Sequence, residues 1–216
     1  MAGTDEAPVI IEPERTAGSC VIWLHGLGAD GHDFESIIPG LGLPEPLGVR
    51  FVLPHAPVRP VTINGGMPMR AWFDLRQPNL DHNPDLSGIE QSVAGLRALL
   101  AQQEATGIPR ERIVLAGFSR GGVVALETAL SMHDKPAGVL ALSTWLAQPV
   151  SDAHGLCVFM AHGEHDHVVP PALAIASRDM LRTLGAEVEW HNYPMAHAVH
   201  PTEIADIGAW LRARLT

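Results

Sequence analysis

Two patterns of apolar residues alternate along this chain. Continuous runs of three to five apolar residues are typical of strands buried on both faces, and apolar residues spaced three or four apart indicate helices. The predicted strands cover 9–11, 20–24, 49–53, 113–116, 138–142, 156–160 and 187–190, and the predicted helices cover 34–41, 87–107, 123–129, 171–184 and 204–215. This alternation predicts an α/β protein with a mostly parallel sheet and helices on both faces.

The predicted helix over 87–107 has a recognisable N-terminal capping signal. Ser87 and Glu90 have the spacing of a capping box, so the long helix that ends near Gly107 is expected to begin there. No repeat, low-complexity tract or linker divides the 216 residues, of which 46% are hydrophobic and 18% charged. This is enough apolar material for one core, so we expect a single domain over residues 1–216.

The segment 54–84 shows neither the helical nor the strand-like spacing of apolar residues. Its prolines at positions 54, 57, 60, 68, 78 and 84 and the pair Gly65-Gly66 predict an irregular loop. The side chains of Met67, Met69, Trp72 and Phe73 are ones that a chain prefers to bury, which argues against disorder. Two interpretations stay open, a loop folded over the core under its own side chains and a loop that faces the substrate.

Charge and composition exclude several classes of partner. The net charge of −10 argues against nucleic acid and anionic membranes as partners, and no apolar run approaches the roughly 18 residues that cross a bilayer. Residues 1–8 lack the apolar core of a signal peptide, and the only two cysteines, Cys20 and Cys157, fall in predicted buried strands. We therefore expect unpaired thiols and a cytoplasmic protein, and a homodimer stays open.

The hexapeptide Gly117-Phe-Ser-Arg-Gly-Gly122 follows the predicted strand 113–116 and precedes a predicted helix. A strand, a Gly-x-Ser-x-Gly turn and a helix together form the context of a nucleophile elbow, in which a tight turn exposes the serine at a helix N-terminus. The competing interpretation is that Ser119 merely caps a helix. With strand and helix in place, the sequence favours Ser119 as a nucleophile.

A serine nucleophile needs a histidine base and a carboxylate that orients this base. In doubly wound hydrolases the acid and then the histidine follow the serine along the chain. Glu164 and Asp166 come after the predicted strand 156–160, and residues 193–200, which include two histidines, come after the last predicted strand. These two loops are expected to supply the acid and the base.

The chain resembles the phospholipase/carboxylesterase family of α/β-hydrolases, which includes bacterial carboxylesterases and acyl-protein thioesterases. The similar segments are His25-Gly-Leu-Gly-Ala-Asp, Leu53-Pro-His-Ala-Pro, Ala71-Trp-Phe-Asp, Gly117-Phe-Ser-x-Gly-Gly, His162-Gly-x-x-Asp-x-Val-Val-Pro and Met195-x-His. This resemblance implies the α/β-hydrolase fold, with Ser119 as nucleophile, Asp166 as triad acid and His197 as base. It also implies an oxyanion hole formed by the backbone N–H groups of Leu27 and Arg120.

Arg120 departs from the family pattern, in which Gln commonly follows the serine. The backbone N–H is unchanged, so the oxyanion hole is expected to survive. A cation beside the positive end of a helix is mildly unfavourable. We therefore favour an ion pair between Arg120 and a nearby acid over a role in selecting anionic substrates.

Several other residues are candidates for the site. His162, His165 and His167 could suit zinc by spacing, but no fourth ligand is evident, so we expect no metal and no cofactor. His25 and His200 are interpreted as structural or substrate-lining, because one base suffices. The predicted substrate-binding residues are Trp72, Trp145, Met67 and Met69.

The leading hypothesis is a serine carboxylesterase that hydrolyses small-molecule acyl esters of short to medium chain through an acyl-enzyme. An acyl-protein thioesterase or lysophospholipase with the same triad, and a non-catalytic binding protein on the same scaffold, are the alternatives. Residues 54–84 could cover the active site, but they include few large apolar residues, which predicts a shallow cleft. The selectivity of this cleft for acyl length is expected to depend on Trp72.

Overall fold

The computed structural model describes residues 6–77, 80 and 83–216. The first five residues, on which part of the expectation about a signal peptide rests, lie outside this description. Residues 78–79 and 81–82 of the predicted irregular segment, with the proline at 78, also lie outside it.

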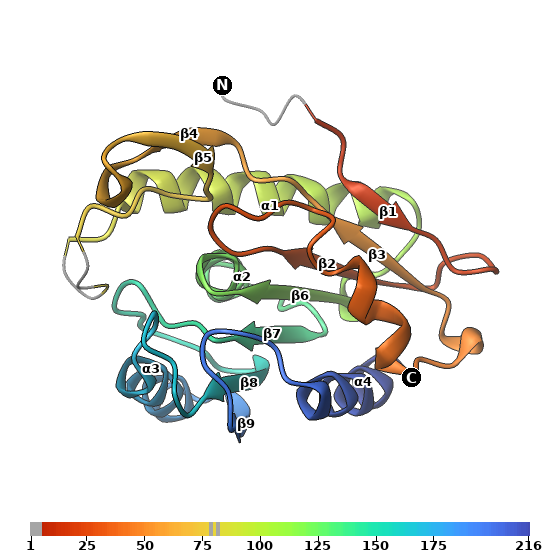
Figure 1. Ribbon diagram of the computed structural model, residues 1–216. Coiled ribbons are helices and arrows are strands. Elements are labelled where there is room, and N and C mark those ends of the chain that lie inside the picture. The colour runs from red at the N-terminus through yellow and green to blue at the C-terminus, as the bar shows by residue number, and fades with distance from the viewer. Residues whose placement is uncertain (1–5, 78–79, 81–82) are drawn as a thin grey trace.

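A seven-stranded sheet in the order β1-β3-β2-β6-β7-β8-β9 forms the centre of the molecule (Figure 1). All neighbouring strands in it are parallel except β1 and β3, so the prediction of a mostly parallel sheet is confirmed. The strands are β1 (Val9–Ile11), β2 (Ser19–Leu24), β3 (Val49–Leu53), β6 (Ile113–Phe118), β7 (Gly138–Leu142), β8 (Cys157–Gly163) and β9 (Glu187–Tyr193). The loops after β2, β6, β8 and β9 consequently begin at one edge of the sheet.

Helices cover both faces of the sheet, as predicted. Alternate residues of β2 point to opposite faces, so Ile22 and Leu24 enter one core and Val21 and Trp23 the other. The first core lies under α1 (Leu86–Ala105), α2 (Arg120–Leu130) and α3 (Pro171–Thr183), and the second under α4 (Pro201–Leu215) and the 3-10 helix Glu35–Leu41. The sheet is therefore buried from both sides.

Strands β8 and β9 run three residues beyond their predicted ends. The ladder continues through the pairs Ala161–His191 and His162–Asn192 to Gly163 and Tyr193. The prediction stopped where polar side chains begin, but the ladder is formed by backbone groups, which do not depend on side-chain polarity. His162 consequently lies within β8 and not in the loop after it.

The predicted capping box of α1 is wrong. The helix begins at Leu86, so Ser87 lies inside its first turn, and Asp85 occupies the N-cap position without a capping side chain. The Asp85 carboxylate instead accepts from the Asp74 backbone N–H at 2.9 Å. A capping box is found at α4, where the His200 ring caps the helix and the Glu203 carboxylate accepts from the His200 N–H at 3.0 Å.

The segment 54–84 is less irregular than predicted. It contains a two-stranded antiparallel hairpin of β4 (Val58–Val61) and β5 (Met67–Arg70), beside α1 in Figure 1. Pro60 and Pro68 lie opposite each other, which a two-stranded ribbon tolerates because each strand has an unpaired edge. Two of the prolines that suggested an irregular loop are thus accommodated in an isolated hairpin.

Two expectations from composition can be compared with the structure directly. Cys20 is buried and Cys157 is half-buried, and both are free thiols. No helix within the described ranges is long and apolar enough to cross a bilayer.

Candidate active site

Ser119 stands between β6 and α2 in a strained backbone conformation, with φ 55° and ψ −120°. Such a conformation costs about 1–3 kcal/mol, and the surrounding structure has to enforce it. A Cβ on either Gly117 or Gly121 would lie within 2.5 Å of backbone atoms, so the elbow is as tight as its glycines predicted. The Ser119 N–H donates to Leu142 O at 2.9 Å, and Thr144 Oγ1 donates to Ser119 O at 2.7 Å. These two bonds fix the strained residue.

Asp166 and His197 form a hydrogen-bonded pair, with 2.7 Å between Asp166 Oδ2 and His197 Nδ1. The second oxygen, Oδ1, accepts from the N–H groups of Val168 and Val169 at 2.9 and 2.8 Å. Burial raises the pKa of Asp166, but these hydrogen bonds and the imidazole outweigh it and hold the pKa below its usual value. An ionised carboxylate can only accept, so Nδ1 carries the proton and Nε2 is left as an acceptor. Glu164, the other candidate acid, is exposed to solvent.

The loops that carry this pair are bonded to each other. The Glu164 N–H donates to Tyr193 O at 2.9 Å, and the His165 N–H donates to Met195 O at 3.0 Å. Gly163 permits the contact, because a Cβ there would lie 2.5 Å from Met195 O. Backbone bonds at the ends of β8 and β9 therefore hold the acid and the histidine together, although 31 positions separate them.

A cavity of about 330 Å³ opens at Ser119. The described residues give the Ser119 hydroxyl no hydrogen bond to His197, but both side chains line this cavity, and the His197 ring packs 4.6 Å from that of Phe118. Catalytic hydrogen bonds are often longer before substrate binds. The predicted residues that line the cavity are Leu27, Ser119, Arg120, Trp145 and His197, and those the sequence missed include Leu75, Leu80, Phe118, Val168 and Val169.

The loop after β2, residues 25–31, is held from behind through His25. Trp72 Nε1 donates to His25 O at 2.8 Å, and the Ala56 N–H donates to His25 Nε2 at 3.0 Å. Burial lowers the pKa of His25 to about 4, so the neutral ring serves as the acceptor. These contacts fit the structural interpretation of His25, and they fix the loop that brings Leu27 to the cavity.

The Arg120 side chain is buried, with only 3% of its surface exposed. Its Nη1 donates to Phe73 O at 3.0 Å, its guanidinium carbon lies 5.5 Å from the Phe73 ring centre, and its Nη2 has no hydrogen-bond partner. Burial lowers the pKa of Arg120 to about 10, although the negative charge of Asp74 acts to raise it. The expected ion pair is not found among the described residues, because a carbonyl and an aromatic ring hold the cation instead.

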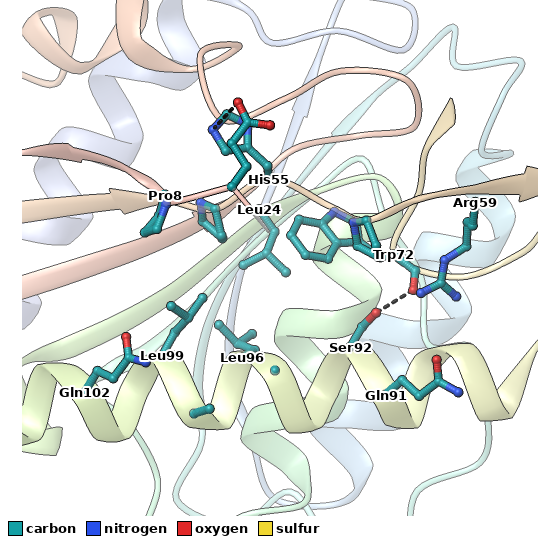
Figure 2. A pocket seen from close by; sticks show the side chains of 15 residues that line it. Pro8, Leu24, His55, Arg59, Trp72, Gln91, Ser92, Leu96, Leu99 and Gln102 are labelled. Atoms are coloured by element: carbon teal, nitrogen blue, oxygen red, sulfur yellow. Dashed lines mark hydrogen bonds and ion pairs between the residues drawn. The ribbon is translucent and has the colours of Figure 1, made fainter. Parts of the chain in front are cut away.

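The four predicted substrate-binding residues are divided by the structure. Trp145 lines the Ser119 cavity. Met67 and Met69 belong to β5, outside the described lining of that cavity, and Met67 is 61% exposed. Trp72 is buried against a second cavity, beside α1 (Figure 2). The two methionines instead take part in the hairpin, where Met67 pairs with Val61 and Met69 with Arg59.

The histidines near Asp166 do not form a metal site. His162 is buried, and its Nε2 lies 2.9 Å from Val169 O and 3.5 Å from Asp166 Oδ2. His165 and His167 are exposed. Over the described part of the chain, no group of three or more His, Cys, Asp or Glu residues is arranged to hold a metal ion.

Comparison with known proteins adds a family and several relatives. A family model described as "Phospholipase/Carboxylesterase" matches residues 5–215. The chain is 36% identical over 225 residues to "Acyl-protein thioesterase 1" of Gibberella zeae, covering 97% of this chain and 96% of that protein. The crystal structure of Arabidopsis thaliana SOBER1 superposes with a TM-score of 0.85 at 28% identity, covering 92% of this chain and 99% of that one. Zea mays acyl-protein thioesterase 2 superposes with a TM-score of 0.83 at 28% identity, covering 97% and 99%.

Proposed function

Because this chain belongs to the phospholipase/carboxylesterase family, we propose that it is a serine carboxylesterase with the triad Ser119, His197 and Asp166. The chain has the α/β-hydrolase fold, and its relatives indicate a hydrolase of esters or thioesters. One observation carries the finer proposal. A serine held at φ 55° shares a cavity with a histidine whose Nδ1 is bonded at 2.7 Å to a buried carboxylate.

Acylation begins when Ser119 Oγ attacks the carbonyl carbon of the ester and His197 Nε2 takes the hydroxyl proton. The Asp166 carboxylate stabilises the imidazolium that forms. The oxyanion accepts hydrogen bonds from the N–H groups of Leu27 and Arg120, and Arg120 is the first residue of α2, where N–H groups have no intrahelical acceptor. Collapse of the intermediate breaks the bond to the alcohol, which leaves with the proton from His197.

In deacylation the same groups activate a water molecule, which attacks the acyl-enzyme. His197 Nε2 takes a proton from water, whose oxygen attacks the acyl carbon, and the same oxyanion donors stabilise the second intermediate. The bond to Ser119 Oγ then breaks, and the serine recovers its proton from His197. The products are a carboxylic acid and the regenerated hydroxyl, so the cycle balances without a cofactor.

The size of the cavity supports short to medium acyl chains. At roughly 30 Å³ for each water-sized group, about 330 Å³ holds on the order of ten such groups. Leu75, Leu80 and Trp145 supply apolar lining. A palmitoyl chain has more atoms than this space holds, which favours esters up to about hexanoyl or octanoyl.

An acyl-protein thioesterase is the second candidate, and the names of the relatives favour it. The chemistry at Ser119 would be unchanged, with a thiol leaving in place of an alcohol. The two candidates differ in the substrate that is hydrolysed with the higher kcat/KM. Comparing nitrophenyl butyrate with a short peptide that carries a thioester-linked acyl chain separates them.

The proposal is tested by hydrolysis of nitrophenyl butyrate with Ser119→Ala and a matched control. Ser131 is at the other end of α2, so Ser131→Ala makes the same change away from the cavity. We expect Ser119→Ala to abolish nearly all turnover and Ser131→Ala to keep it. Full activity in a folded Ser119→Ala protein would refute the proposed nucleophile.

A further inference from the structure

A second cavity, of about 340 Å³, lies between α1 and the segments that precede β1 and follow β3 (Figure 2). In the figure, Leu96 and Leu99 rise from α1 toward Leu24, and Trp72 stands at the side. These four side chains give the cavity an apolar wall. No described residue lines both this cavity and the one at Ser119, so the two are separate spaces.

One cationic side chain at this second cavity, that of Arg59, has no ion-pair partner among the described residues. Arg59 comes from β4 and lines the cavity together with Ser92 and Gln91, and Figure 2 shows its guanidinium directed toward α1. Its Nε is buried without a hydrogen-bond partner, although the residue as a whole is only half-buried, and among the described residues Arg59 enters no ion pair. Buried polar groups in folded proteins nearly always have a partner. The unpaired Nε is thus a donor at the wall of the cavity that an acceptor on a ligand could use.

The acid at the cavity is already paired. The Glu6 carboxylate contacts the Arg70 guanidinium and lies 3.9 Å from His55 Nε2. His55 Nδ1 accepts from the Gly31 N–H at 3.0 Å, so a neutral His55 carries its proton on Nε2, on the side of Glu6. Among the described residues that line the cavity, Arg59 is thus the charged side chain without an ion-pair partner.

We propose that this cavity binds a single-chain fatty acid. Its carboxylate would accept hydrogen bonds from Arg59, because a guanidinium matches the planar geometry of a carboxylate. Its chain would lie against Leu24, Leu96 and Leu99, with Trp72 at the side. The cation at the edge of this apolar space would pair with the carboxylate of a fatty acid, and the apolar wall would contact the hydrocarbon chain. This inference does not depend on the chemistry at Ser119.

The volume sets the length of the chain. At roughly 30 Å³ for each water-sized group, about 340 Å³ holds on the order of ten non-hydrogen atoms, the number in octanoate. Each added methylene should tighten binding about fourfold while the cavity can still enclose it. We therefore expect affinity to rise from butyrate to octanoate and to level off for longer chains.

The test is isothermal titration calorimetry of the full chain with octanoate below its micelle concentration. Arg59→Gln removes the cation and should weaken octanoate binding about 10- to 100-fold, the range for a hydrogen bond to a charged group. The same substitution should leave the affinity for 1-octanol within about threefold, because the alcohol carries no charge to lose. Thermal unfolding of each variant checks that it is folded.

Gly95 offers a way to fill the cavity without disturbing the core. It lines the cavity from α1, and a Cβ there would meet nothing within 4 Å. Gly95→Phe should remove octanoate binding, and Gly95→Ala, the matched control, should keep it because a methyl group leaves most of the space open. Both changes replace a helical glycine, so neither should weaken α1.

Two results would overturn the proposal. The first is the absence of octanoate binding to the unchanged chain. The second is the same octanoate affinity in the unchanged chain, Arg59→Gln and Gly95→Phe, because the acid would then occupy another site, such as the cavity at Ser119. Neither result bears on whether Ser119 is a nucleophile, which ester turnover tests separately.

Discussion

Two cavities of nearly equal volume, about 330 and 340 Å³, differ in the groups around them. The first contains a strained serine and a histidine bonded to a buried carboxylate. The second has an apolar wall and the guanidinium of Arg59, which forms no ion pair among the described residues and has a buried Nε without a hydrogen-bond partner. Volume alone therefore does not distinguish the proposed catalytic site from the proposed binding site. The arrangement of a few polar atoms does.

Trp72 contacts both regions in different ways. One side of its ring lines the second cavity, while its Nε1 donates to His25 O in the loop that carries Leu27. Ser92 Oγ on α1 donates to Trp72 O. A residue that the sequence suggested as a substrate contact thus lines the second cavity and is hydrogen-bonded to the loop that carries Leu27. It supports the proposed oxyanion hole from behind.

The largest effect should come from the reacting groups of the first cavity. We expect Ser119→Ala and His197→Ala each to lower kcat on nitrophenyl butyrate by roughly four to six orders of magnitude. The double variant should lose little more than either single one, because the two groups act as a unit. Steady-state and single-turnover assays measure this, and additive losses would show that they act independently.

The next largest effect should distinguish the two acids. Asp166→Asn keeps the shape of the side chain but no longer favours the tautomer with the proton on His197 Nδ1, so kcat should fall about 10⁴-fold. Glu164→Gln is the matched control, since its exposed side chain should matter little. A greater loss in the Glu164 variant would assign the acid role to that residue.

A smaller effect should separate the two tryptophans. Trp145→Ala should lower kcat/KM on a hexanoyl ester about 10- to 100-fold and affect an acetyl ester less, because Trp145 lines the cavity where the chain would lie. Trp72→Ala should lower both esters by the same factor, since it acts through His25. This revises the sequence-based expectation that Trp72 sets acyl selectivity. A loss confined to the hexanoyl ester in the Trp72 variant would restore that expectation.

The smallest effect should come from Arg120. We expect Arg120→Gln to change kcat/KM on a neutral ester by no more than a few fold, whereas losing an oxyanion donor costs about 100-fold or more. The backbone N–H remains, and Gln can still donate to Phe73 O. Inactivity of a folded Gln variant toward neutral esters would show that the guanidinium itself takes part in the reaction.

Local sequence signals were sufficient for the elbow and for the strands that carry it. Gly117 and Gly121 indicated a turn that only glycine permits, and the structure has backbone atoms within 2.5 Å of where their Cβ atoms would be. The mostly parallel sheet followed from buried apolar runs such as 113–116. These features depend on short stretches of chain, where composition and backbone geometry are directly linked.

Features that depend on long-range packing were predicted less well. Leu75 and Leu80 line the Ser119 cavity, but nothing in the local pattern sets them apart from Met67. The hairpin that turns Met67 outward is pinned by backbone contacts such as Gly28 N–H to Arg70 O at 2.9 Å, which join distant segments. Such contacts are not encoded in any one stretch, so periodicity could not reveal them.

The most direct test is to trap the acyl-enzyme. The full chain is mixed with nitrophenyl butyrate, quenched with acid during turnover, digested and analysed by mass spectrometry. We predict one butyryl group on the peptide that contains Ser119, no such adduct in Ser119→Ala, and accumulation of the adduct in any His197 variant that still acylates. Rapid turnover with no adduct on that peptide, or with a butyryl group on another residue, would contradict the account.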